Sequence, residues 1–139
     1  MIITKFTLFE NFNEKEKADI ISFFQDIFDL EHDYFQVRSI DTKNVLEKRY
    51  QKVIKHNYSV SSAGNFVIQI WCDFSFAWSI ENEIKTDIVP RLKFLEYKTT
   101  IRNVATSEKV YKVLPTSSGG TTIMGDSIHL ITVTIKKTF

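Results

Sequence analysis

The side chains that could carry out catalysis are few, and their spacing does not assemble a reactive group. Cys72 is the only cysteine, and a nucleophilic thiol must be partly exposed with a lowered pKa. Cys72 falls instead on the apolar side of an alternating segment, which predicts a buried small hydrophobe. Asp126, Ser127 and His129 include the residue types of a hydrolase triad, but neighbours within one strand cannot reach its geometry. With no catalytic motif in the sequence, we predict that the protein is not an enzyme.

The sequence also lacks a clear motif for binding a metal ion or a phosphate group. Glu31-His32-Asp33 is the densest group of metal-ligating residue types, but consecutive side chains diverge and no second His or Cys pair stands at ligand spacing. We interpret these residues as a solvated helix end. Gly119-Gly120 lacks the Lys-Ser/Thr pair of a phosphate-binding loop and indicates a flexible connection. We predict neither a metal nor a cofactor.

A basic stripe is the candidate for nucleic-acid binding. Lys48, Lys52 and Lys55 stand at helical spacing, with Arg49 beside them, in a helix predicted over 42–56. Such a stripe can neutralise phosphates, and nearby aromatic rings can stack on bases. We favour a solvated helix face, so nucleic acid is an alternative partner and not the expected one.

Trp71 is the candidate for binding another protein. It lies between Gln69 and Asp73 on the polar side of the longest alternating segment. A large aromatic ring at such a position is either covered by a helix or exposed as an anchor for a partner. We favour a covering helix and keep the anchor as the alternative.

The elements that position these residues belong to a chain with few breaks. Its 139 residues include four Gly and two Pro, and 43% are hydrophobic. This composition is typical of a packed globule, and the length suits one domain over 1–139. We expect no signal peptide and no membrane span, because no segment has the required run of apolar residues.

Charge is balanced overall but uneven along the chain. The net charge of +1 excludes a global field that would attract DNA or an anionic membrane. The first 33 residues nevertheless hold three basic and eight acidic side chains. This distribution suits head-to-tail association of copies, although we favour a fold that scatters the charges.

Local patterns predict the elements of the first half. Alternation over 2–9 predicts a strand, and weaker alternation over 34–40 predicts another. Asn13 and Glu16 have the spacing of a capping box at the start of a helix over 14–30. The apolar stripe that this helix would lay on a sheet consists of Ile20, Phe24, Ile27 and Phe28.

The clearest signal is strict alternation over 66–80, which predicts a long, half-buried antiparallel strand with a bulge or bend. A turn over 62–65 would join it to a strand over 58–61 as a hairpin. Over 79–98 the apolar spacing is helical, and Pro90 is expected to end or offset a short helix.

Further strands are predicted over 97–104, 109–114 and 127–138, with one long Gly-containing loop over 115–126. The final strand has apolar residues on both faces, which indicates a place inside the sheet. Together these elements predict an α+β fold: a mostly antiparallel sheet with two or three helices packed on one face.

This order of elements resembles the tail terminator and tail-completion proteins of tailed bacteriophages. The resemblance covers mainly residues 65–139, with the long strand, a helix containing the break Ile88-Val89-Pro90, the Gly-rich loop and the final strand from Ile128 to Ile135. The opening Lys5–Asn11 is also similar to the start of many small phage proteins. The predicted N-terminal strand and basic helix depart from the family's pattern.

The resemblance implies a non-enzymatic virion subunit that forms a homo-oligomeric ring, commonly six-fold, beside other proteins of the phage neck or tail. A tail terminator and a head-tail connector are the two types expected. The alternative is a small nucleic-acid-binding or host-factor-binding module that uses the basic helix. The interface residues expected for the ring are Trp71, Ser117, Ser118, Gly119, Gly120, Thr121 and Met124.

Overall fold

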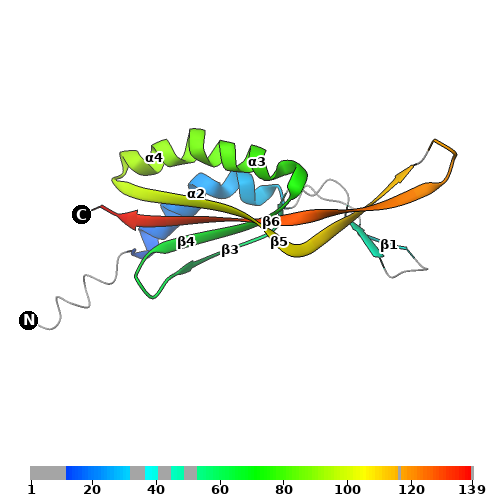
Figure 1. Ribbon diagram of the computed structural model, residues 1–139. Coiled ribbons are helices and arrows are strands. Elements are labelled where there is room, and N and C mark those ends of the chain that lie inside the picture. The colour runs from blue at the N-terminus through cyan, green and yellow to red at the C-terminus, as the bar shows by residue number, and fades with distance from the viewer. Residues whose placement is uncertain (1–11, 32–36, 41–44, 49–52, 116, 139) are drawn as a thin grey trace, which may run out of the picture.

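The computed structural model describes residues 12–31, 37–40, 45–48, 53–115 and 117–138. Its elements are α2 (Glu14–Asp29), β1 (Val37–Ile40), β2 (Val45–Lys48), β3 (Val53–Val60), β4 (Phe66–Asp73), α3 (Phe74–Glu83), the π-helical turn η1 (Ile84–Ile88), α4 (Val89–Phe94), β5 (Tyr97–Pro115) and β6 (Thr121–Lys137). The strands form one sheet in the order β1-β2-β5-β6-β4-β3, antiparallel except for β2 with β5. The predicted α+β fold is confirmed, with the helices on one face of the sheet (Figure 1). None of the helices in these ranges is long and apolar enough to cross a bilayer.

Helix α2 begins and packs as its sequence predicts. The Asn13 side chain accepts a hydrogen bond from the Glu16 amide at 2.8 Å, and the Asn13 amide donates to the Glu16 carboxylate at 3.0 Å. This capping box satisfies donors that the first turn of a helix leaves unpaired. The helix predicted over 14–30 is therefore confirmed to within one residue. Its buried stripe consists of Ile20, Phe24, Ile27 and Phe28.

Burial alternates across the body of the sheet, which we define as β3, β4, β6 from Ile128 onward, and β5 up to Ala105. One side, the helix side, packs under α2, α3 and α4. None of these helices, which are the ones among the described residues, lies over the other side, which we call the open side (Figure 1). The paired register keeps each side continuous from strand to strand. The core on the helix side includes Phe66, Ile68, Ile70, Cys72, Ile131, Val133 and Ile135.

The strand predicted over 66–80 is wrong beyond Asp73. There the Asp73 carboxylate accepts a hydrogen bond from the Ser75 amide at 3.2 Å and starts helix α3. The apolar residues of 74–80 fit both the two-residue period of a strand and the 3.6-residue period of a helix, so the pattern that predicted a strand also contains a helical stripe. That buried stripe consists of Ala77, Ile80, Ile84, Ile88 and Leu92.

Pro90 offsets this helix without ending it. The chain stays helical from Phe74 to Phe94, with the π-helical turn η1 directly before Pro90. Proline lacks an amide hydrogen and crowds the preceding turn of a regular helix, whereas one wider turn admits the ring and lets the helix continue as α4.

The helix predicted over 42–56 is wrong. Its described parts are strands: β2 in the first half and the beginning of β3 in the second. The β-branched Val53 and Ile54 favour an extended chain, and pairing with β4 outweighs the helical spacing of the lysines. The strand predicted over 34–40 is confirmed for Val37–Ile40, and the strand predicted over 2–9 lies outside the described residues.

The hairpin predicted from the turn at 62–65 is confirmed, because β3 and β4 pair on either side of it. In that turn, Gly64 has a φ of +83°, a conformation that glycine adopts without strain. At the other end of the chain, the strands are longer than predicted. β5 joins the two predicted strands over 97–114, and β6 begins at Thr121, so the predicted loop over 115–126 is mostly strand.

Glu16 ties the start of α2 to the sheet. Its carboxylate accepts hydrogen bonds from Lys137 Nζ at 2.9 Å and from the Tyr97 hydroxyl at 3.3 Å. Burial would raise the pKa of Glu16, but the hydrogen bond with the Asn13 backbone and the contact with Lys137 together lower it. A lowered folded-state pKa contributes stability above the unfolded pKa, and this contribution is lost as the pH falls through the folded value.

Replacing Glu16 by Gln should keep the capping geometry, because Gln also serves at this position, but remove the charge that Lys137 contacts. We expect a loss of about 1 kcal/mol in the free energy of unfolding at pH 7. The loss should disappear below the folded pKa, where the wild-type carboxyl is also neutral. A series of urea unfolding curves from pH 7 downward measures how the loss changes with pH. Glu14→Gln, on the exposed side of the same helix turn, is the control, and an equal loss at every pH would contradict the role given to the charge.

Candidate assembly surface

The long β5–β6 hairpin extends beyond the helices. Past the body, paired rungs run from Lys109 opposite Ser127 to Pro115 opposite Thr121. At about 3.3 Å per residue this part is about 20 Å long. We call residues 109–127 the arm, and Figure 1 shows it projecting from the end of the body where α3 begins.

A bulge separates the arm from the body. The register of β5 and β6 shifts between Ala105 and Lys109. Thr106 stabilises the irregular segment, because its hydroxyl donates to the Ile128 carbonyl at 2.7 Å and accepts from the Glu108 amide at 3.2 Å. Bulges bend a strand and increase its twist, so these hydrogen bonds set the direction in which the arm leaves the body.

The small hairpin of β1 and β2 widens the sheet at the arm. β2 pairs in parallel with β5 where Glu47 lies opposite Tyr111. Figure 1 shows α2, α3 and α4 over the body and none of them over the arm. A sheet is stabilised by packing against a second layer, and the described helices form no such layer over this part of the sheet.

Most of the interface residues predicted from the sequence lie at the tip of the arm. Ser117, Ser118, Gly119 and Gly120 form an exposed turn, in which Gly119 has a φ of +86°. Thr121 and Met124 lie in β6 and not in a loop. The segment is therefore a structured hairpin tip, where the sequence predicted a flexible connection.

Trp71 lies in the body, apart from the arm. It is half-buried on the open side, in one row with Leu130 and Val104. Lys55 covers part of the ring, with its Nζ 4.7 Å from the ring centroid. The described helices pack on the opposite side of the sheet, so none of them is the helix expected to cover Trp71.

The predicted basic stripe is not assembled. Lys48 ends β2 and Lys55 lies in β3, while Arg49 and Lys52 fall outside the described residues. Two strands in different parts of the sheet replace the predicted helix. A nucleic-acid-binding module built on that helix therefore loses its structural basis.

Residues considered for catalysis are held in structural contacts. Cys72 is fully buried, and burial, with a contribution from Asp73, raises the pKa of its thiol to about 12. His129 is also buried, and its ring shares a hydrogen bond with Asn103 at 2.8 Å and contacts the ring of Phe74. These contacts make Cys72 and His129 parts of the packed interior.

The acidic end of α2 is a packing contact. Glu31 pairs with His56 of β3, and the His56 ring stacks on Phe28 with 4.0 Å between centroids. His32 and Asp33 fall outside the described residues. Within the described ranges, no group of three or more His, Cys, Asp or Glu side chains could hold a metal ion.

A hollow of about 660 Å³ lies at the opposite end of the body from the arm, between α4 and the start of β5. Its polar members include Lys93, Glu96 and Tyr97. Burial, with the charge of Glu16 second, raises the pKa of the Tyr97 hydroxyl to about 12, so this group keeps its proton near neutral pH. The lining contains no pair of a nucleophile with a base.

Two surface features were missed from the sequence. Phe74 and Trp78 are 49% and 62% exposed at adjacent turns of α3, and the Phe74 ring contacts His129, two residues from the arm. Besides Lys55, three further basic residues lie on the open side of the body: Lys98, Arg102 and Lys136. The sequence contained a signal for these basic residues. Lys98 and Arg102 are four residues apart in a predicted strand, so their side chains lie on the same side of it.

Replacing Trp71 by Ala should cost about 1–2 kcal/mol of stability, because one side of the ring already faces solvent. Ile70→Ala, at the next residue of the same strand, removes a fully buried side chain and should cost about 2–5 kcal/mol. Urea unfolding of both variants compares the two sides of β4 directly. A loss for Trp71→Ala as large as that for Ile70→Ala would show that another layer covers the open side.

Comparisons were made with models of protein families, with curated proteins and with solved structures, and none of them matches this chain.

Proposed function

We propose that this chain is a non-enzymatic structural subunit of a phage neck or tail, which forms a homo-oligomeric ring of the tail terminator or head-tail connector type. The observation that carries the proposal is the arm: a hairpin about 20 Å long that leaves the body and is covered by none of the described helices. An isolated two-stranded ribbon is marginally stable in water. Contact with a neighbouring subunit would supply the layer that the arm lacks.

The arm also suits the geometry of a ring. A contact between an arm and a different surface of the next copy is heterologous, and heterologous contacts close into rings when the rotation between copies permits. The arm leaves from one end of an elongated body, so the surface that receives it lies elsewhere on the next copy (Figure 1).

The exposed pair Phe74 and Trp78 is a suitable surface to receive an arm. Large apolar side chains exposed side by side mark protein contacts more often than isolated ones do. Aromatic residues also dominate the energetic centres of interfaces. The Phe74 ring is fixed in place by its contact with His129, so this part of the surface is preorganised for binding.

The arm can be tested by shortening its tip. Replacing residues 114–122 by Asn-Gly would join the paired residues Val113 and Ile123 through a two-residue turn. The pairing between Glu47 and Tyr111 is kept. We expect an unchanged circular dichroism spectrum and urea midpoint, but association weaker by at least roughly tenfold in sedimentation velocity.

A matched control lengthens the hairpin of the body by inserting two Gly residues between Ser62 and Ala63, in an exposed turn. This variant should assemble like the wild type. Assembly by the tip-shortened variant at wild-type affinity would contradict the role of the arm. Mass spectrometry of purified virions tests the location, and absence of the chain from the particles would overturn the proposed function.

A further inference from the structure

The open side of the body carries a uniformly basic surface, which we call the basic face. Lys55, Lys98, Arg102 and Lys136 are all exposed there, on β3, β5 and β6. The single acidic residue on this side of the body strands is Asp73, which is buried and caps α3. A chain with a net charge of +1 thus presents four positive charges on one side of its sheet.

We infer that the basic face binds the sugar-phosphate backbone of single-stranded nucleic acid. This inference does not depend on the proposed ring, because it uses the open side of the body and leaves the arm and the outer side of α3 free. Phosphate contacts by Lys and Arg supply most of the affinity in binding that does not depend on sequence.

The positions of two lysines point to an anionic ligand. Lys98 and Lys136 are direct cross-strand partners on the open side. Like charges placed directly opposite each other destabilise a sheet, and neither lysine has an acidic cross-strand partner among the described residues. A phosphate bound across the pair would remove the repulsion. Arg102 lies four residues along β5 from Lys98, about 13 Å away, so a second phosphate could bind farther along the same strand.

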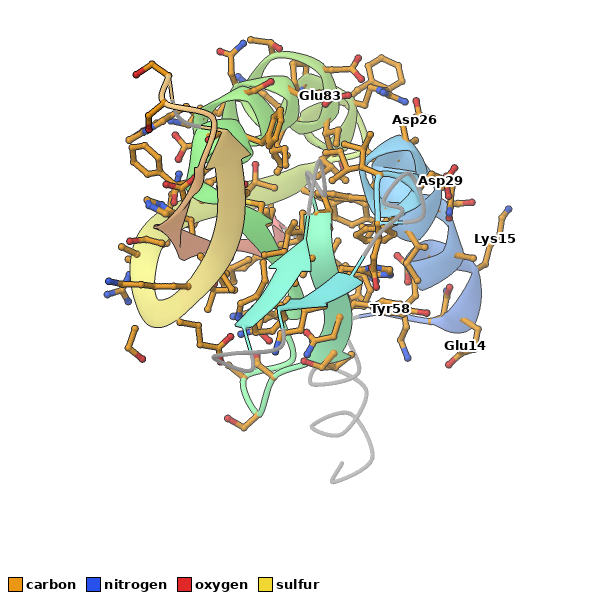
Figure 2. The ribbon with its side chains drawn as sticks, turned by 90° about the vertical axis from the view of Figure 1, so that its right-hand side faces the viewer. Glu14, Lys15, Asp26, Asp29, Tyr58 and Glu83 are labelled. Carbon is orange, nitrogen blue, oxygen red and sulfur yellow. The ribbon has the colours of Figure 1, made fainter. Side chains whose placement is uncertain are left out.

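The remaining side chains suit a polynucleotide better than a protein. Between the cations lie hydroxyl and amide groups, which donate hydrogen bonds to phosphate and sugar oxygens; they are Asn57, Gln69, Thr100, Thr132 and Thr134. Lysine and serine are depleted in protein interfaces, whose centres are apolar. The competing partner for the basic face is the acidic outer side of α2 on a second copy of the chain, which carries Asp26 and Asp29 (Figure 2). That side of α2 would bring few apolar groups to the interface, because the basic face itself is polar.

Trp71 supplies a ring on which a base can stack. It lies half-exposed among the polar side chains, in one row with Leu130, and Lys55 Nζ lies over part of its ring. A half-exposed ring on a sheet accepts an unstacked base, whereas a duplex keeps its bases paired and stacked. One ring without a set of base-reading side chains predicts little preference among sequences.

Fluorescence anisotropy with labelled 20-mers of deoxythymidine and of uridine, and with a 20-base-pair DNA duplex, tests the inference. Binding of either single strand, tighter than that of the duplex, is the expected result, and the two single strands distinguish DNA from RNA. With three or four phosphates neutralised, affinity should fall roughly 20- to 50-fold between 50 and 200 mM salt. Absence of single-strand binding at 50 mM salt, or tighter binding of the duplex, would overturn the inference.

The variant Lys98→Gln/Lys136→Gln removes two of the proposed phosphate contacts, so the slope of log affinity against log salt should become shallower by about 1.4. The matched control, Lys15→Gln/Lys17→Gln, removes the same charge from two lysines of α2, which packs on the other side of the sheet (Lys15 in Figure 2). It should retain the wild-type slope. An equal effect of both variants would overturn the assignment to the basic face.

Trp71→Phe should keep most of the affinity, and Trp71→Ala should weaken binding by roughly tenfold, with folding checked by circular dichroism. Sedimentation velocity of the Lys98→Gln/Lys136→Gln variant separates this inference from self-association. Lost association together with no binding of single strands would assign the basic face to a second copy and overturn the inference. Retained association with lost oligonucleotide binding would support it, whatever the outcome for the arm.

Discussion

Hydrogen bonding along both edges of β6 is the constraint on which the rest of this molecule depends. Within the body, β6 pairs with β4 on one side over Ile128–Ile135, and on the other side it pairs with β5 from the end of the body to the tip of the arm. A slip of one residue in the pairing would turn Ile131, Val133 and Ile135 away from the core and place the polar residues between them there instead. The same slip would change the pairing within the arm, so the core and the projecting surface share one register.

That register divides the molecule into surfaces with different chemistry. On the helix side, contacts between distant segments hold the helices to the sheet, as when Glu16 of α2 meets Lys137 of β6 and Glu31 meets His56 of β3. On the open side, the same strands present lysine, arginine and threonine to solvent. The arm continues β5 and β6 beyond both sides, so a contact at its tip need not disturb either surface.

The sequence predicts this fold best where one local signal stands alone. The Asn13 and Glu16 capping box marked the start of α2, and the apolar residues that follow fit only the helical period of 3.6 residues. At 74–80 two periods coincide, and the residue that decides between them is Asp73, through its cap on α3. The lysines of 48–55 look helical by their spacing, but Lys48 lies in β2 and Lys55 in β3. For Lys55 the strand is decided by pairing with β4, about 15 residues farther along the chain.

The candidate surfaces were predictable only in part, for the same reason. The Gly-rich segment was located correctly, but its conformation depends on strand pairing beyond the bulge at Thr106. Trp71 was placed correctly on the polar side of its strand, whereas the side on which the helices pack is a property of the whole chain. The four cations of the basic face come from three strands, and only the register of the folded sheet brings them together.

The place of β6 also affects how the chain folds. β4 and β5 are not neighbours, and each pairs with β6, which follows both in the sequence. The β3–β4 hairpin and the α3–α4 helix can form early from local contacts, but the two halves of the core cannot join until β6 enters between them. Its pairing of Asp73 with Ile128 closes a long loop, and such non-local closure is slow. Until then β4 has one unpaired edge, which is a site for misassociation with another chain.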